Sequence, residues 1–207
     1  MPVEIWFEKK ELTPDELLEQ GDFLLSCSFP VVEGYAEDGE MNISIAEDVS
    51  AVVLTQSCDL ANKKVENVVF GVCLSLDRYI QKRFESIKSE KIEKGAADNA
   101  ELSHQIKGMI KQELVKMCRV EAINTFILPK IPSLDEMYIV NFDDIFSLPY
   151  GVAVKLFRNQ KRIIRLKSPY RECLSQSFAR SFMRVGLDER VSTDECQKTL
   201  DAFFINL

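Results

Sequence analysis

Histidine is scarce in this sequence, and cysteine is never clustered. His104 is the single histidine, and the six cysteines lie at positions 27, 58, 73, 118, 173 and 196. Zinc sites use Cys and His ligands at short, regular spacings, and no such spacing occurs here. We therefore expect no metal ion and no other cofactor, and we expect the cysteines to be reduced and mostly buried as small apolar residues.

Long apolar runs are also absent. A membrane-spanning helix would need a stretch of about 18 or more apolar residues, and none occurs. The opening residues, MPVEIWFE, lack the basic region and the long apolar region of a secretory signal peptide. These absences predict a cytoplasmic protein without a membrane partner.

The overall composition is typical of a folded protein. Hydrophobic residues make up 46% and charged residues 29% of the 207 positions, which excludes a disordered or fibrous chain. A chain of this length can bury one sizeable core. We expect a single domain over residues 1–207 that carries an insertion.

The charges are distributed unevenly along the chain. Residues 1–50 contain thirteen acidic residues and two lysines, whereas residues 151–187 contain nine Lys or Arg residues and one acid, Glu172. Two interpretations are open. Either the two segments pack on each other, or each presents its electric field to a partner.

The first third of the chain is predicted to consist mainly of strands. A short strand over 3–7 precedes a short helix over 13–20, in which Thr13 caps the helix, Pro14 takes the first helical position and Glu16 completes a capping box. Apolar runs and alternating patterns predict further strands over 23–27, 41–45, 51–54 and 68–73.

The spacing of apolar residues changes to that of helices between 76 and 120. Two apolar stripes are present, formed by Leu76, Ile80, Phe84 and Ile87, and by Leu102, Ile106, Ile110, Leu114 and Met117. Each predicted helix has a charged outer face opposite its stripe. We interpret residues 76–120 as a helical hairpin inserted into a β domain.

The last part of the chain returns to strands and ends in helices. Strands are predicted over 125–128, 137–140, 152–157 and 162–166, the last two as a hairpin that turns at Asn159 and Gln160. A helix from Ser168-Pro169 to Gly186 and another after Ser192 form a C-terminal helical extension over 168–207. Together the elements predict an α+β fold, a small, strongly bent β-barrel with helices at its side and end.

The stretch VVLTQSCDL, residues 52–60, contains the candidate catalytic residues Cys58 and Asp59. A cysteine nucleophile needs a base or a positive field that lowers the pKa of its thiol. His104, or the lysine pair at 63–64, can be considered for that role. The alternative is structural: Cys58 points inward at the end of a strand, while Ser57 and Asp59 bond the backbone of the turn.

The basic segment near the C-terminus indicates a different site. Arg162 and Arg165 lie on one predicted strand, and Arg180 and Arg184 lie one turn apart on the following helix. Such a surface can bind the phosphate groups of a nucleic acid. The alternative is that arginines of this segment, among them Arg165 and Arg171, pair with the acidic N-terminal half.

Residues 20–75 resemble the start of the PemK/MazF family. The resemblance is carried by Gly21-Asp22 at the opening of a strand, an acidic loop, and a Val-Val-Leu-Thr strand followed by another loop. It implies a fold like an SH3 barrel and an RNA-binding and cleavage groove to which Thr55 and Gln56 would contribute. In the loop that follows, Lys63 and Lys64 are further candidate contacts for a ligand or RNA.

A second resemblance rests on two stretches and implicates most of the chain. VVLTQSCDL and LSQSFARSFMRVGL, residues 174–187, are similar to signatures of uncharacterised bacterial proteins. This resemblance implies a bacterial or phage origin and no particular reaction.

Three hypotheses for the function follow. The first is a non-enzymatic interaction subunit or small effector of a bacterial defence or toxin-antitoxin system, with a protein partner. The second is a nucleic-acid-binding protein or endoribonuclease of PemK/MazF type, and the third is a Cys58-dependent hydrolase or transferase. We favour the first, because each of the others needs a catalytic or binding group that the sequence does not clearly supply.

Overall fold

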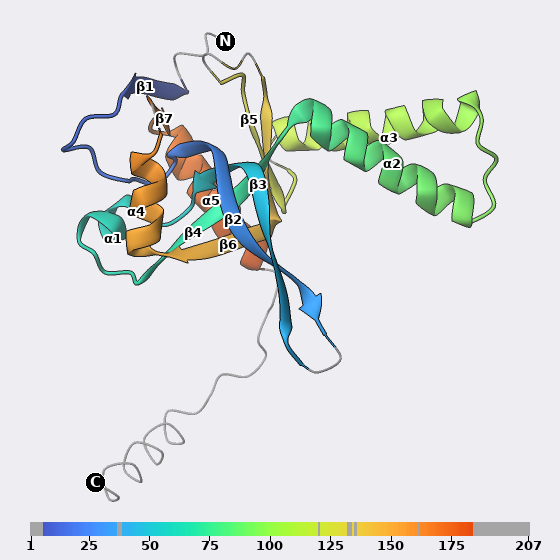
Figure 1. Ribbon diagram of the computed structural model, residues 1–207. Helices are drawn as coiled ribbons and strands as arrows, with labels where there is room; N and C mark the ends of the chain where they lie inside the picture. The colour runs from blue at the N-terminus through green and yellow to red at the C-terminus, as the bar shows by residue number, and fades with distance from the viewer. Residues whose placement is uncertain are drawn as a thin grey trace, which may run out of the picture.

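The computed structural model describes residues 6–36, 39–119, 121–131, 134, 136–160 and 162–183, and it confirms an α+β fold (Figure 1). The main sheet has five strands, β2 (Phe23–Tyr35), β3 (Met41–Val53), β4 (Asn67–Ser75), β5 (Thr125–Leu128) and β6 (Tyr138–Pro149). They lie in the order β2-β3-β4-β6-β5, and all neighbours are antiparallel. A separate two-stranded sheet pairs β1 (Phe7–Glu11) with β7 (Arg162–Leu166).

The predicted barrel is not confirmed. Within the described part of the chain the main sheet stays open, with β2 and β5 as its edges. Register shifts interrupt the pairing of β2 with β3 and of β4 with β6, as expected for β-bulges that bend a sheet. The bending that the sequence suggests is therefore present without closure.

The helical hairpin predicted over 76–120 is present as α2 (Leu76–Glu93) and α3 (Ala100–Cys118). Figure 1 shows the two helices side by side, extending away from the sheet. The apolar stripes meet in a cluster of their own that includes Ile87, Leu102, Ile106 and Ile110. Ser75 and Asn99 cap the two helices through their side chains.

Residues 150–158 are a helix, so the strand predicted over 152–157 and its hairpin are wrong. Helix α4 (Tyr150–Arg158) buries Ala153 and Phe157, which lie four residues apart and so share one helix face. The alternating letters of VAVKLF match a strand equally well, because the two periods cannot be told apart over so short a segment. Strand β7, which the prediction places correctly, pairs with β1 instead.

The short helix predicted over 13–20 is also absent, because the carbonyl groups of this segment bind arginine side chains. Arg158 Nη1 donates to Thr13 O over 2.7 Å, and Arg158 Nη2 donates to Glu16 O. Arg165 Nη2 donates to Leu17 O over 2.8 Å. The capping signals at 13–16 lead only to a turn, in which Glu16 N donates to Thr13 O.

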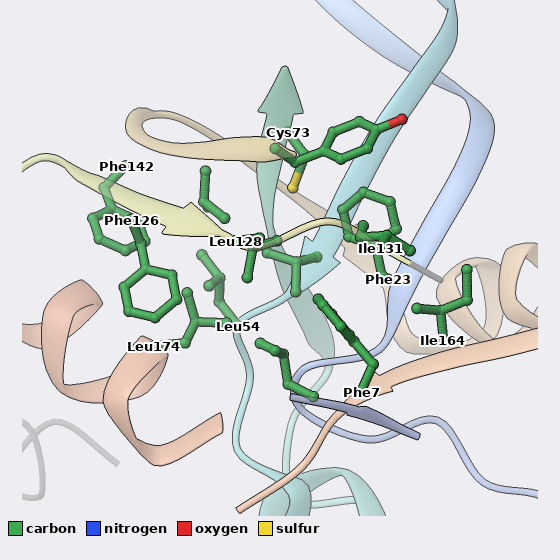
Figure 2. Close-up of a cluster of buried hydrophobic side chains, with 14 residues drawn as sticks. Phe7, Phe23, Leu54, Cys73, Phe126, Leu128, Ile131, Phe142, Ile164 and Leu174 are labelled. Atoms are coloured by element: carbon green, nitrogen blue, oxygen red, sulfur yellow. The ribbon is translucent and has the colours of Figure 1, made fainter. Parts of the chain in front are cut away.

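The main sheet is buried on both faces, which explains the continuous apolar run at 51–54. Val52 and Leu54 belong to one core cluster, together with Phe7, Phe126 and Leu174 from other elements (Figure 2). The neighbouring residues Ala51 and Val53 belong to a second cluster on the other face. Alternate side chains of a strand point to opposite faces, so a strand covered on both sides reads as uniformly apolar.

Two further helices complete the fold. Helix α1 (Ser57–Ala61) follows β3, and α5 (Tyr170–Phe182) covers one core cluster with Leu174. The helix predicted from Ser168-Pro169 is confirmed, and its predicted end at Gly186 and the helix after Ser192 lie outside the described residues. None of the helices described here is long and apolar enough to span a membrane.

A candidate interaction surface at the β2–β3 arm

The outer halves of β2 and β3 form a two-stranded projection that we call the arm, residues 29–35 and 41–49. Figure 1 shows it extending well beyond the rest of the sheet. Its register pairs Val32 with Ile43 and Pro30 with Ile45. The arm thus places these four apolar residues on one face, because directly opposed residues of an antiparallel pair share a face.

This face of the arm is apolar and exposed. Ile43 and Ile45 are each 58% exposed, Val32 is 55% exposed, and Met41, on the same face by alternation, is 54% exposed. Single exposed apolar residues are ordinary, but a contiguous set on a projecting element is typical of a surface that a partner covers. The exposed apolar face of the arm is therefore a candidate binding surface.

Neither edge of the arm pairs with a further strand in the described part of the chain, because β2 is the end strand of the sheet and β3 separates from β4. Strand β3 pairs with β4 only over Ser50–Val53, so its residues 41–49 have β2 as their only strand partner within the described chain. The backbone groups on the outer side of 41–49 form no backbone hydrogen bond with any other described element. A free strand edge is a template for pairing with another extended chain.

A groove of about 790 Å³ opens where β3 leaves β4. Its walls include the β3 residues 46–50, the end of β4, the first turns of α2 and the bulged part of β6. Apolar and aromatic side chains at its base include Phe29, Phe146 and Tyr138. Arg78 and Lys82 stand on the α2 side, and Glu47, Asp48, Glu136 and Asp144 make the acidic part of the lining.

Two residues of the groove have an unusual backbone conformation. Ser26 has φ of 50° and Asp48 has φ of 55°, in the left-handed region that residues other than glycine seldom adopt. Register shifts in β2–β3 pairing lie next to Ser26. Conformations of this kind occur often at binding sites, where the surrounding fold holds them in place.

Tyr138 is an acid in the groove whose pKa is raised, as is that of the buried Cys73. Burial, and next a hydrogen bond from its hydroxyl to Glu136 Oε2 over 3.1 Å, raise the pKa of Tyr138 to about 12. The phenol is therefore neutral at physiological pH and acts as a hydrogen-bond donor. It cannot serve as a base there.

The side chains of the VVLTQSCDL stretch hold the fold together. Thr55 Oγ1 accepts a hydrogen bond from Val69 N over 2.7 Å, and Ser57 Oγ accepts one from Gln20 N over 3.1 Å. Gln20 Nε2 in turn donates to Leu54 O over 2.8 Å. Two of the hydroxyls in this stretch therefore tie the end of β3 to β4 and to the loop before β2.

Cys58 lies in the exposed first turn of α1, so the interpretation in which it points inward is wrong. Its thiol Sγ lies 3.6 Å from Gln56 Oε1 and 3.8 Å from Asp59 Oδ1. Both of these oxygens are hydrogen-bond acceptors from the thiol, and neither supplies a positive charge beside the sulfur. His104 is an exposed residue of α3 in the helical hairpin.

We expect Cys58 to react with a thiol reagent as an ordinary exposed cysteine does. In the native protein Cys58, Cys118 and Cys173 should be labelled at similar rates, whereas the buried Cys27 and Cys73 should react only after unfolding. Burial also raises the pKa of Cys27 to about 11. Site-resolved iodoacetamide labelling measures these rates.

The matched control for this measurement is Cys58→Ser, which should remove one labelled site and leave the other rates unchanged. A labelling rate for Cys58 at least about tenfold above that of Cys118 would contradict the expectation and revive a catalytic role.

Arg165 is buried in a cluster of acidic residues from the N-terminal part of the chain. Its Nε and Nη2 donate to the two carboxylate oxygens of Asp22 over 2.5 and 3.0 Å. Its Nη1 donates to Glu16 over 3.1 Å and to Glu19 over 2.8 Å. Burial, against the opposing effect of Arg165, raises the pKa of Asp22 to about 6. Arg165 is only 5% exposed.

The basic and acidic segments of the chain therefore pack on each other at this cluster. Arg171 adds a contact from Nη1 to Glu19 over 3.3 Å. Arg165 has no surface to offer a nucleic acid, so the predicted RNA contact does not agree with its position. The side chain of Arg162 and all of Arg184 lie outside the described residues.

The remaining predicted contact residues are separate from the arm. Gln56, Lys63 and Lys64 are exposed around α1, and Arg180 is exposed on α5. None of them lines the groove. The sequence does not single out the groove residues, because an exposed strand and a strand buried on one face share the same alternating pattern.

No group of three or more His, Cys, Asp or Glu residues is arranged to hold a metal ion in the part of the chain that the structure describes. The exposed carboxylate of Asp143, for example, accepts hydrogen bonds from Asn124 Nδ2 over 2.8 and 3.0 Å. Comparison with known family models, curated proteins and solved structures found no match to this chain.

Proposed function

We propose that this protein is a non-enzymatic interaction subunit that binds a protein partner through the β2–β3 arm. The observation that carries this proposal is the exposed apolar face of the arm, with Met41, Ile43 and Ile45 each more than half exposed beside a free strand edge. Covering such a face removes apolar area from water and so favours association. The setting, a bacterial defence or toxin-antitoxin system, stays a prediction from the sequence signatures.

The other two hypotheses receive less support. Residues 11–62, which include the whole arm, contain no Lys or Arg and twelve acidic residues, so this part of the protein repels the phosphates of RNA. The arginine at the centre of the predicted basic surface is enclosed by carboxylates. Among the residues that the structure describes, the thiol of Cys58 contacts only Gln56 and Asp59, and neither can activate it as a nucleophile.

The variant Ile43→Asp/Ile45→Asp tests the proposed function. The tagged protein should recover a stoichiometric partner from a lysate of its source organism, and this variant should recover at least about tenfold less, because two carboxylates cannot be buried in an apolar interface. Quantitative mass spectrometry of the recovered proteins measures the difference.

Ile92→Asp is the matched control, because Ile92 is a 41% exposed isoleucine on α2, far along the chain from the arm. It should recover the same partner as the unmodified protein. If the arm variant and the control recover the same proteins in the same amounts, the arm is not the binding surface and the proposal fails. Unchanged melting curves show that both variants are folded.

A further inference from the structure

The free edge of β3 and the groove form one continuous surface. The groove begins at the point where pairing with β4 stops, and five consecutive β3 residues, 46–50, line it. A chain extended along 41–49 would therefore run beside the free backbone groups of the arm and end in the groove. Its side chains on one face would lie next to the apolar face of the arm.

The charged residues that line the groove are four acids and two bases, and the acids alone lie on the β3 and β6 sides. Glu47 and Asp48 lie on β3, and Asp144 lies across the groove on β6. None of the three forms an ion pair with any described residue. Arg78 and Lys82 stand only on the α2 side, so the β3 side of the path presents uncompensated carboxylates to an incoming chain.

This charge pattern favours one kind of binding partner over another. A second copy of the arm would bring its own Glu47 and Asp48 to a surface that is already acidic, and charges of the same sign repel each other. A segment with cations opposite the carboxylates gains from the same arrangement. Charge complementarity therefore favours a basic partner over self-association.

We propose that the free edge of β3 accepts one additional strand, a segment of a partner protein in which apolar residues alternate with lysine or arginine. This inference rests on the proposed function and adds the mode of binding and the chemistry of the partner. Backbone hydrogen bonds to residues 41–49 supply affinity, and the alternating side chains meet the apolar face and the acidic groove.

Binding of synthetic peptides to the full chain tests this inference. The probes are about nine residues long, the length of 41–49. One alternates lysine with valine, and a second alternates glutamate with valine. By fluorescence anisotropy the lysine peptide should bind at least about tenfold more tightly than the glutamate peptide. Equal affinities would overturn the proposed partner chemistry.

N-methylated peptides test for strand addition directly. The lysine peptide is methylated on the backbone nitrogens of either all its lysines or all its valines, which keeps its charge. Only one edge of an added strand faces β3, so one methylated form should lose at least about tenfold in affinity and the other should keep it. Equal binding of both forms would show a purely electrostatic contact and overturn the inference.

The triple variant Glu47→Gln, Asp48→Asn and Asp144→Asn removes the three carboxylates with little change in shape. Asparagine suits position 48 because it tolerates the left-handed conformation there. The preference for the lysine peptide should fall at least about tenfold in this variant. Unchanged preference would overturn the assigned role of these carboxylates.

The control variant Glu93→Gln, Glu101→Gln and Glu121→Gln changes the net charge equally at exposed residues away from the groove. It should keep the preference. If the peptides fail these tests while Ile43→Asp/Ile45→Asp still loses its partner, the mode of binding is wrong and the proposed function stands. If that variant keeps its partner, the proposed function itself fails.

Discussion

Replacing Arg165 with methionine should lower the free energy of unfolding by about 3–5 kcal/mol, because it leaves three carboxylates grouped around an uncharged, buried side chain. Asp22, Glu16 and Glu19 all bond this one guanidinium group, and the side chain of Asp22 is itself only 1% exposed. A buried ion pair contributes little compared with an apolar replacement of both partners, but removal of one partner alone is costly. Urea denaturation followed by fluorescence measures the loss.

The matched control is Arg78→Met, because Arg78 is an exposed arginine without an ion pair in the described part of the chain. We expect a change within about 0.5 kcal/mol for it. The double variant Asp22→Asn/Arg165→Met should lose less unfolding free energy than Arg165→Met alone, because the Asp22 carboxylate is removed together with its partner. A loss below about 1 kcal/mol for Arg165→Met would show that the cluster is not a stabilising contact.

The unfolding free energy lost in Arg165→Met should also depend on pH. In the unmodified protein the pKa of Asp22 is about 6, above its ordinary value of 3.8, so the folded state binds a proton more readily than the unfolded state. For such a group, lowering the pH through 6 favours folding. In Arg165→Met the guanidinium that lowers the pKa of Asp22 is gone, whereas the burial that raises it remains. Asp22 is therefore protonated and uncharged at pH 5, and the stability difference between Arg165→Met and the unmodified protein should be smaller at pH 5 than at pH 8.

Replacing Phe70 with alanine should cost about 3–5 kcal/mol of unfolding free energy, because it removes a fully buried ring and leaves a cavity. Phe70 is 0% exposed, and its ring stacks on that of Phe146 with centroids 5.2 Å apart. Phe146 lies in turn 4.0 Å from the ring of Phe29, at the base of the arm. The ring of Phe70 also lies 6.0 Å from that of Phe29, so the substitution removes one of three aromatic rings that pack together at the base of the arm.

Thermal and urea denaturation measure this effect, and Phe182→Ala is the control. Phe182 is a phenylalanine at the end of α5 that is 58% exposed, so its loss should change stability by less than about 1 kcal/mol. Similar losses for the two variants would contradict the central place that we give to Phe70 in the core.

The helical hairpin and the central strands were predictable because their patterns are long and unambiguous. Helices α2 and α3 run over 18 and 19 residues, long enough for an apolar stripe at helical spacing to exclude a strand. The apolar run at 51–54 is typical of a strand that is covered on both faces. Helix α5 has the same kind of signal, in Leu174 and its neighbours at four-residue spacing.

The candidate site was much less predictable. The sequence indicates that the acidic and basic segments either pair or face partners, and the structure shows pairing at Arg165 and Arg171. The conspicuous stretch VVLTQSCDL attracted a catalytic interpretation, yet Thr55 and Ser57 bond backbone groups within the fold. The alternation of Met41, Ile43 and Ile45 correctly predicts a strand, but it does not indicate that these side chains are exposed.

The sequence by itself therefore determined those properties that depend on neighbours along the chain: the helical hairpin, the positions of most of the strands, the buried run before Thr55 and the separation of charge. Only the tertiary structure decided that 13–20 is a loop around two arginines, that 150–158 is a helix, and that β3 leaves β4 to form an arm and a groove. Each of these depends on residues more than a hundred positions away or on where a strand pairing stops, and local spacing contains no information about either.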